Sequence, residues 1–175
     1  WDCWRRNTAE PGDLLVVTGP LGGSLLGRHL NVTPRCHEAL AIASKCQVHA
    51  AIDISDGLAI DCSRLMSASQ TGAIIDIESV PIHADAVSLS DLKCNSSLTP
   101  IQHALQDGED FELLLAIPPD DAHAFVGGDP QKLVPQTTMQ PRIVGAVTEK
   151  IELLGRTADG QTQPLEPKGF EHAFT

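Results

Sequence analysis

The chain has 175 residues, 42% of them hydrophobic, and a formal net charge of −11, which suits one domain with a substantial core or at most two small ones. The acidic balance argues against nucleic acid, because phosphate backbones are bound mainly by clustered lysine and arginine. No apolar run approaches the ~20 residues that span a bilayer, and no signal peptide is expected, because no basic segment followed by an apolar one opens the sequence. The sequence therefore predicts a cytoplasmic protein that binds neither nucleic acid nor membrane.

The five cysteines give no sign of a zinc site or a disulfide framework. They are odd in number, widely spaced and without a C-x-x-C pair: Cys3, Cys36, Cys46, Cys62 and Cys94. Reduced thiols in a cytosolic protein are the simplest expectation.

Six apolar runs have the length and composition of strands. The first, residues 13–19, reads DLLVVTG and follows a turn signal at Pro11 and Gly12. The others are residues 48–55, 73–77, 111–117, 142–149 and 151–155. The last two are expected to pair with each other, and Asp159 and Gly160 are expected to form the turn of a closing hairpin.

Five segments between these runs are predicted to be helical from their apolar spacing and start signals: 20–30, 33–46, 56–69, 97–106 and 118–127. In the second, Thr33 is the expected N-cap and Pro34 the first helical residue. Leu40, Ala43 and Cys46 would then share its apolar face. Residues 81–95 show no assignable pattern.

The third predicted helix, residues 56–69, has the clearest spacing, with Leu58, Cys62, Leu65 and Met66 in a helical period. Strands alternate with helices for most of the chain. This alternation predicts an α/β domain with a mixed sheet covered by helices. Residues 1–12 are polar and irregular, so they are expected to be a linker.

The stretch AAIDISDGLAI, residues 50–60, places Asp53, Ser55 and Asp56 where a strand meets a helix. Two interpretations stay open. Ser55 or Asp56 could cap the helix, which explains one acid. Alternatively, Asp53 and Asp56 could hold a divalent cation, which would relieve their mutual repulsion and allow an acidic protein to bind a phosphate compound.

A second acidic stretch, QDGEDFELLLAI, covers residues 106–117. Glu109 and Asp110 on their own indicate a turn with solvated acids. Alternation along the following strand places Glu112 on the face opposite Leu113 and Leu115. Glu112 should therefore lie at a sheet edge or beside a buried cation.

The stretch TGPLGGS, residues 18–24, is a glycine-rich turn between a strand and a helix. It matches neither standard glycine motif for phosphate, so its glycines are expected to serve tight packing. No serine stands in a G-x-S-x-G motif, and no catalytic nucleophile is assigned.

In chain order, PGDLLVVTGPLGGS, AIDISDGLAID, GAIIDIESVPI, ALQDGEDFELLL and KGFEHAF resemble the C-terminal domain of thiamine-monophosphate kinases. That family belongs with the aminoimidazole ribonucleotide synthetases and selenophosphate synthetases. The resemblance runs from about Arg6 to the end, and DISDGL followed by GEDFEL is specific to the kinase branch. It implies a three-layer α/β/α sandwich around a mixed sheet, over residues 13–175.

The resemblance also implies an activity, the ATP-dependent phosphorylation of thiamine monophosphate to thiamine diphosphate with Mg²⁺ and no phosphoenzyme. Asp53 and Asp56 match the family's Mg²⁺ ligands. Ser55 and Arg6 match residues at ATP.

Two more positions match residues at the second substrate. Glu109 matches a residue at the thiamine phosphate. Phe170, in KGFEHAF, matches an aromatic residue against the thiamine rings, and stacking an aromatic ring on a cationic thiazolium is physically favourable.

The sequence does not include the family's N-terminal domain, which the resemblance implies would carry the other metal ligands and the main dimer contact. The chain is therefore expected to be inactive alone, and a homodimer is expected of the full-length protein. Two alternatives remain: a non-catalytic binding or assembly module of this fold, and another ATP-dependent member of the superfamily.

Overall fold

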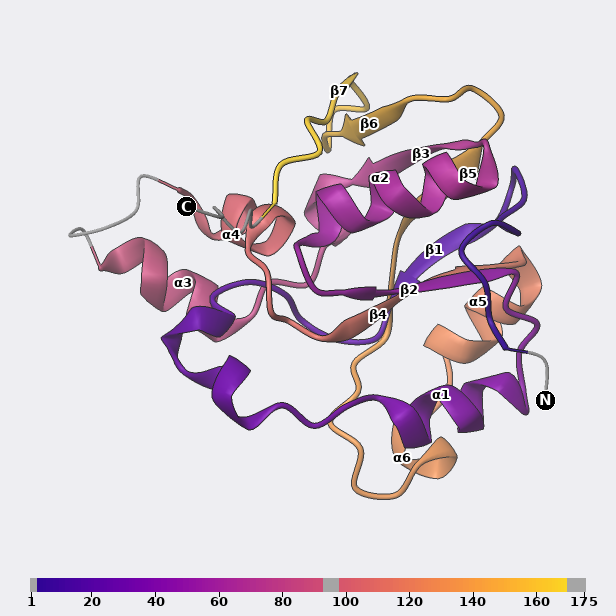
Figure 1. Ribbon diagram of the computed structural model, residues 1–175, viewed down its shortest axis with the longest axis horizontal. Helices are drawn as coiled ribbons and strands as arrows, with labels where there is room; N and C mark the ends of the chain where they lie inside the picture. The colour runs from indigo at the N-terminus through magenta and orange to yellow at the C-terminus, as the bar shows by residue number, and fades with distance from the viewer. Residues whose placement is uncertain (1–2, 93–97, 170–175) are drawn as a thin grey trace, which may run out of the picture.

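The computed structural model describes residues 3–92 and 98–169, which form a seven-stranded sheet in the order β2-β4-β1-β5-β3-β6-β7 (Figure 1). The strands are β1 Leu14–Val17, β2 Ala50–Ile54, β3 Gly72–Asp76, β4 Glu112–Ile117, β5 Arg142–Thr148, β6 Leu153–Arg156 and β7 Thr162–Pro164. β3 and β6 pair in parallel, whereas the other strand pairs are antiparallel. The sheet is therefore mixed, as predicted.

Helices lie on both faces of the sheet. They are α1 Cys36–Ala43, α2 Leu58–Ser69, α3 Ala84–Asp91, α4 Pro100–Gln106, α5 Pro119–Val126 and α6 Pro130–Leu133, with 3₁₀ turns η1 Ser24–Leu26, η2 Arg28–Asn31 and η3 Ile77–Ser79. α2 and α4 pack on one face, and α1, α5 and α6 pack on the other (Figure 1). α3 contacts α4 and η1.

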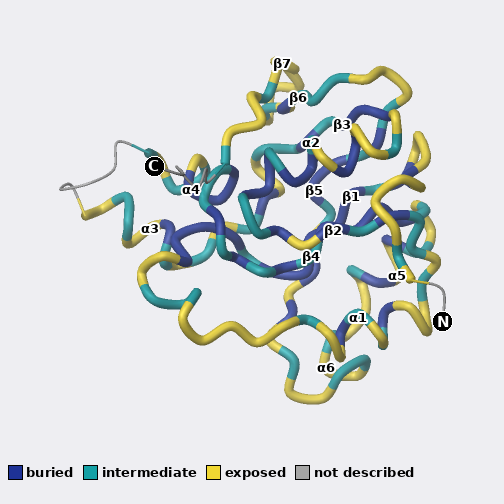
Figure 2. Tube along the Cα trace, viewed as in Figure 1, coloured by how far each residue is buried: buried dark blue, intermediate teal, exposed yellow. Residues whose placement is uncertain are grey.

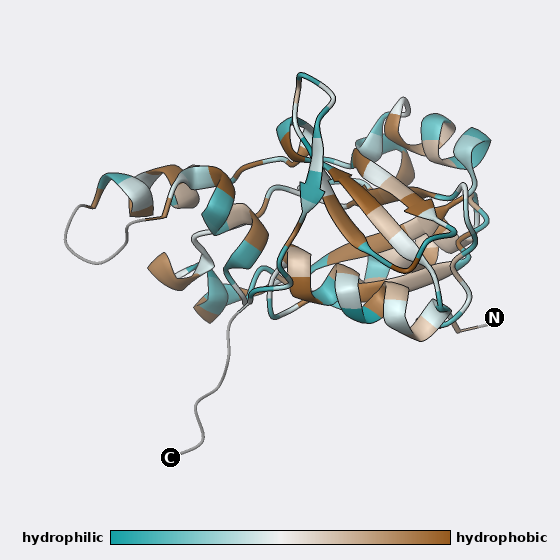
Figure 3. Cartoon of the chain, turned by 90° about the horizontal axis from the view of Figure 1, so that it is seen from above, coloured by the Kyte–Doolittle hydropathy of each residue, from teal (hydrophilic) through white to brown (hydrophobic). Residues whose placement is uncertain are grey.

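Both faces of the central strands are buried. In β1, Leu15 and Val17 belong to the core under α2, whereas Val16 belongs to the core under α1 and α5. Leu114 and Leu115 of β4 divide in the same way. Figure 2 shows the central strands in the buried colour, and Figure 3 shows hydrophobic stretches concentrated on them. Two cores on one sheet give the three layers that the resemblance implies.

The prediction that residues 142–149 pair with residues 151–155 is wrong. β3 lies between β5 and β6, with Ile75 opposite Gly145 on one side and Ala73 opposite Leu153 on the other. The connection from β5 to β6 passes over the end of β3, where the N–H of Ala73 donates to the carbonyl of Glu152 at 2.9 Å. The predicted hairpin through Asp159 and Gly160 is confirmed, and joins β6 to β7.

The helix predicted over residues 20–30 is absent, and two short 3₁₀ turns take its place. Gly22, Gly23 and Gly27 have φ of 90°, 74° and 127°, which an α-helix cannot include. The chain is instead held to the acidic loop before β4, as described below.

The helix predicted over residues 33–46 exists as α1, but Thr33 does not cap it, since the N-cap is Arg35 and no side chain bonds there. Its buried residues are Glu38 and Ile42, whereas Leu40 is 55% exposed. The predicted apolar face is therefore wrong for Leu40 and Ala43, which are exposed, whereas Cys46, which follows α1, packs against the core. The ion pair of Arg35 and Glu38 occupies the inner side of the helix start.

The remaining elements agree more closely with the sequence predictions. In α2, Leu58, Cys62, Leu65 and Met66 are all buried, as their spacing indicated. The unassigned residues 81–95 include α3, which the side chain of His83 caps.

The structure also bears on membrane spans and on the cysteines. No helix among the described residues is long and apolar enough to cross a membrane. The four described cysteines are free thiols, whereas Cys94 lies outside the described residues.

Gly145 allows β5 to approach β3 closely, opposite the register shift at Leu15 and Val16 of β1. A Cβ atom at Gly145 would stand 2.1 Å from the carbonyl oxygen of Ile74. We expect Gly145→Ala to lower the free energy of unfolding by about 1–3 kcal/mol or more through overpacking, as measured by urea denaturation.

Gly128→Ala is the matched control, because its nearest backbone atoms would stand 3.3 Å away. It should change the free energy of unfolding by less than about 0.5 kcal/mol. Equal stability of the two variants would contradict the close approach of β5 and β3.

Candidate functional site

Three loops meet at one end of the sheet because of strand register. Ile54, the last residue of β2, stands opposite Glu112, the first residue of β4, and Val17 at the end of β1 stands opposite Leu114. The loop after β2, the loop before β4 and the glycine-rich loop after β1 must therefore lie together. These loops are the two acidic stretches and the glycine-rich turn of the sequence.

Backbone hydrogen bonds connect the first two loops directly. The N–H of Glu109 donates to the carbonyl of Ser55 at 2.7 Å, and the N–H of Phe111 donates to the carbonyl of Ile54 at 2.8 Å. The hydroxyl of Ser24, in the glycine-rich loop, donates to the carbonyl of Glu109 at 2.6 Å. Glu109 thus lies between the other two loops.

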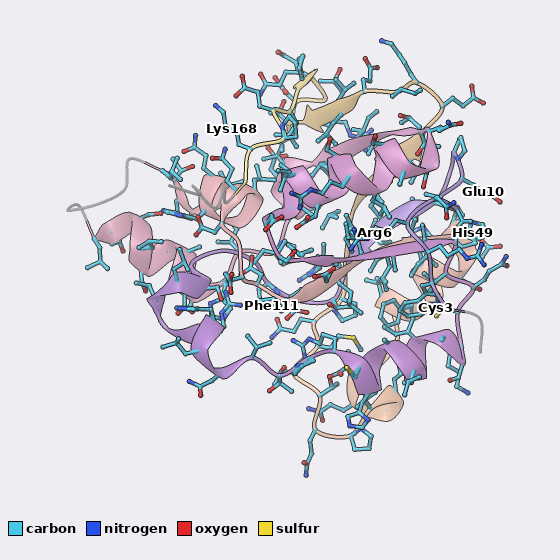
Figure 4. The ribbon with its side chains drawn as sticks, in the orientation of Figure 1. Cys3, Arg6, Glu10, His49, Phe111 and Lys168 are labelled. Atoms are coloured by element: carbon cyan, nitrogen blue, oxygen red, sulfur yellow. The ribbon has the colours of Figure 1, made fainter. Side chains whose placement is uncertain are left out.

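The C-terminal segment reaches the same place. A Cβ atom at Gly169 would stand 2.4 Å from the carbonyl oxygen of Asp56 and 2.4 Å from the side chain of Ile60. Figure 4 shows Lys168, which precedes Gly169, on the segment that runs from β7 toward α4. Phe170 lies outside the described residues, so its predicted role at the substrate stays a prediction.

The capping interpretation of Ser55 and Asp56 is wrong. α2 begins after Gly57, whose φ of 120° and ψ of 149° are not helical, and no side chain caps it. Instead, Asp61 in the first turn of α2 accepts hydrogen bonds from the loop. This buried carboxylate was missed, although an acid in a first turn is a recognisable signal.

Asp53 and Asp56 are both partly exposed, and both are paired with an arginine. The Asp53 side chain is 49% exposed, and its Oδ1 lies 3.7 Å from the guanidinium of Arg6. Asp56 is ion-paired with Arg64 and partly exposed. Their desolvation cost is therefore small, and both carboxylates are accessible from solvent.

The described residues contain no group of three or more histidine, cysteine or acidic side chains that could hold a metal ion. Asp53 and Asp56 nevertheless fit Mg²⁺, which often takes only one or two protein carboxylates together with waters and phosphate oxygens. Asp53 lies in β2 and Asp56 lies in the bend that follows it. Each is accompanied by an arginine that a divalent cation could replace.

The loop before β4 has a strained backbone. Glu109 has φ of 66° and Phe111 has φ of 53°, a conformation that costs about 1–3 kcal/mol in a non-glycine residue and recurs at functional sites. Both residues line a hollow of about 160 Å³ together with Arg28 and Arg35. Glu109 is half-buried, and it lines this hollow from the loop before β4.

The expectation that Asp110 is a solvated acid is wrong. Its side chain is fully buried, its Oδ2 accepts from the N–H of Gly22 at 2.8 Å, and its Oδ1 accepts from Arg28 at 2.9 Å. Burial raises the pKa of Asp110 to about 7, although the Gly22 N–H and Arg28 oppose the shift. Asp107 holds the next amide, accepting from the N–H of Gly23 at 2.8 Å.

These bonds explain the glycines of TGPLGGS. Cβ atoms at Gly22 and Gly23 would stand 2.7 and 2.4 Å from the backbone of α4 and α3, respectively. The expected role in tight packing is confirmed. The glycine N–H groups are occupied by Asp107 and Asp110, so they are not available to a phosphate.

Glu112 is paired with a buried cation, one of its two predicted environments. Its carboxylate accepts from Arg35 Nε at 3.0 Å and from the Thr18 hydroxyl at 2.6 Å. Arg35 also bonds Thr138 at 3.0 Å. This network joins the start of α1 to β1 and β4 beside the hollow.

The family model for the AIR synthase related protein, C-terminal domain, matches residues 10–128. The chain belongs to this family. The match includes all three loops described above.

Among individual proteins, the chain is 41% identical over 172 residues to the thiamine-monophosphate kinase of Rhodopirellula baltica, covering 98% of this chain and 51% of that protein. It is 31% identical to the thiamine-monophosphate kinase of Escherichia coli K12, covering 97% of this chain and 55% of that protein. The chain thus spans about half the length of the curated relatives it matches.

Among solved structures, AaThiL complexed with AMPPCP and TMP superposes with a TM-score of 0.72 and 27% sequence identity. The superposition covers 95% of this chain and 53% of that one. Length and fold therefore agree with the resemblance that the sequence motifs indicated.

The pKa of Asp110 predicts a specific dependence of stability on pH. The unfolded carboxyl has a pKa of about 3.9, so between about pH 4 and pH 7 the folded state binds the extra proton. The contribution of Asp110 to the free energy of unfolding is therefore largest below this range, falls as the pH rises through it and is constant above it. The slope reaches at most about 1.4 kcal/mol per pH unit.

Urea denaturation of the wild type and of Asp110→Asn from pH 5 to pH 8 checks this expectation. The stability of the wild type relative to the variant should fall between pH 5 and pH 7 and level off by pH 8. Parallel pH profiles would show that Asp110 is ionised throughout.

Proposed function

We propose that this chain forms the C-terminal half of a thiamine-phosphate kinase, which transfers the terminal phosphoryl group of ATP to thiamine monophosphate. The observation that carries the proposal is the identity with the Rhodopirellula baltica kinase across nearly the whole chain. The convergence of DISDGL, GEDFEL and the C-terminal KG around one end of the sheet supports it, because distant segments are brought together as a site requires.

Asp53 and Asp56 are proposed to hold Mg²⁺. When bound, Mg²⁺ would neutralise negative charge on the phosphates of ATP. The side chains are suited to this role because both are reachable from solvent and already balance a positive charge, Asp53 with Arg6 and Asp56 with Arg64.

Arg6 and Ser55 are proposed to contact the nucleotide. Arg6 lies beside Asp53 on the sheet edge and has a 59% exposed side chain, so its guanidinium is free to turn toward an anionic phosphate. The carbonyl of Ser55 is bound to Glu109, which fixes the backbone from which the hydroxyl projects.

Glu109 and Phe170 are proposed to contact thiamine monophosphate. Glu109 lines the hollow beside Arg28 and Arg35, and its strained backbone holds it there. Phe170 directly follows Gly169, which packs against Asp56. Phosphoryl transfer depends on positioning and charge neutralisation more than on a strong base, so these roles need no protein nucleophile.

The remaining parts of the proposal concern the whole protein. Residues 1–12 are a linker, residues 13–175 are the C-terminal domain, and the other half supplies the rest of the nucleotide and metal contacts. The full-length protein is proposed to be a cytoplasmic homodimer that binds neither nucleic acid nor membrane.

The test is a kinase assay of the full-length protein with ATP, Mg²⁺ and thiamine monophosphate, in which thiamine diphosphate is separated and quantified. Turnover is expected from the full-length protein and not from the 175-residue chain. Binding of both substrates without turnover would favour a non-catalytic module, and turnover with a different phosphate acceptor would favour another ATP-dependent member of the superfamily.

Asp53→Asn and Asp56→Asn should each lower kcat/KM of the full-length protein about 10²-fold or more, because each removes a preorganised charge that acts on the phosphates. Asp76→Asn is the control, since Asp76 forms an exposed ion pair with Arg156 on the far side of the sheet. Loss of thermal stability with full activity in the first two variants would assign Asp53 and Asp56 a structural role.

A further inference from the structure

Asp61 is a buried carboxylate that holds the whole turn between β2 and α2. It is 1% exposed. Its Oδ2 atom accepts from the backbone N–H groups of Ser55, Asp56 and Gly57 at 3.0, 2.9 and 3.2 Å. Three convergent N–H groups on one anionic oxygen make a charge-assisted arrangement stronger than a neutral cap.

The other oxygen of Asp61 acts on the Asp56 side chain through Arg64. Asp61 Oδ1 accepts from Arg64 at 2.8 Å, and the same nitrogen of Arg64 contacts the carboxylate of Asp56. Because Asp61 and Arg64 are three residues apart on α2, the helix fixes their separation. Asp61 therefore determines both where the Asp56 backbone lies and where its carboxylate points.

This arrangement costs more than a simple helix cap would require. A charge buried to 1% exposure must be compensated by its partners, and a serine or asparagine at the N-cap could satisfy one N–H group without burying a charge. Gly57 occupies the N-cap with a φ of 120°, so the turn is shaped around Asp61 rather than around its own side chains.

We propose that Asp61 is the positioning residue for the metal-binding loop: its two oxygens fix the Ser55–Gly57 backbone and orient Asp56 for a divalent cation. This inference rests on the proposed function, since it assigns Asp56 to the cation. Asp61 itself touches neither substrate. When a cation takes the place of Arg64 at Asp56, Asp61 retains Arg64 as its partner and keeps the loop in place.

Asp61→Asn in the full-length protein tests the proposal. The Mg²⁺ concentration for half-maximal activity should rise about 10- to 100-fold, as is typical when the partner of a metal ligand is removed, while the KM for thiamine monophosphate changes less than about threefold. Calorimetric titration of Mg²⁺ in the presence of AMPPCP should show the same loss of affinity without relying on turnover.

Asp13→Asn is the matched control. Asp13 is also a buried carboxylate, 3% exposed, that accepts from a backbone N–H, that of Glu10 at 2.9 Å, and contacts His49. It precedes β1 at the end of the sheet away from the site. Asp13→Asn should lower the melting temperature and leave the Mg²⁺ requirement unchanged.

Two results would overturn the proposal: an Asp61→Asn protein with a lowered melting temperature and an unchanged Mg²⁺ requirement, or wild-type amides at residues 55–57 that exchange with deuterium as fast as unprotected loop amides. The exchange measurement does not need a variant that folds or a protein that is active. A third result would separate the two proposals: the wild type shows no kinase activity, and the Asp61→Asn variant binds Mg²⁺ in the presence of AMPPCP less tightly than the wild type does. The proposed substrate would then fail, and the positioning role of Asp61 would stand.

Discussion

The antiparallel register of β2 on β4 is the constraint on which the polar features of this protein depend. With Ile54 opposite Glu112, the end of one strand and the start of the other cannot separate, so DISDG and GED must share one edge. Two backbone hydrogen bonds extend this pairing past the strand ends into the loops themselves. β1, paired to the same β4, brings the glycine-rich loop to the same edge.

At this edge, acidic side chains divide into two groups by burial. Asp61, Asp107 and Asp110 point inward and accept backbone N–H groups, so each one fastens a loop that has no regular structure of its own. Asp53 and Asp56 face solvent with arginine partners. The buried acids thus hold the loops in place, whereas the exposed acids remain accessible from solvent.

Features that depend on local sequence were predictable. The apolar run before Gly19 formed a strand, Asp159 and Gly160 formed a hairpin turn, and the period of Leu58 and Cys62 gave the buried face of α2. Asp53 and Asp56 were recognised as paired carboxylates at a junction of strand and helix. The solvent exposure of Asp53 and Asp56 was not predicted, because it depends on the position of β2 at the edge of the sheet.

Features that depend on distant partners were not predictable. β5 pairs with β3 and not with β6, which follows it in sequence, and this pairing depends on contacts between strands that are distant in the chain. The loss of a helix after β1 follows from Asp107 and Asp110, which lie more than 80 residues away in sequence from the glycines they bind. Asp61 was recognisable as an acid in the first turn of a helix. Its three N–H partners were not predictable, because the conformation of Gly57 directs them toward it.

We propose that the loops gathered by β2 and β4 form half of a phosphoryl-transfer site. A crystal structure of the full-length protein with Mg²⁺, AMPPCP and thiamine monophosphate tests it most directly. We predict a Mg²⁺ ion about 2.0–2.1 Å from carboxylate oxygens of Asp53 or Asp56, with Arg64 still bound to Asp61. Mg²⁺ and both substrates bound elsewhere, with Asp53 and Asp56 still paired to Arg6 and Arg64, would contradict the account.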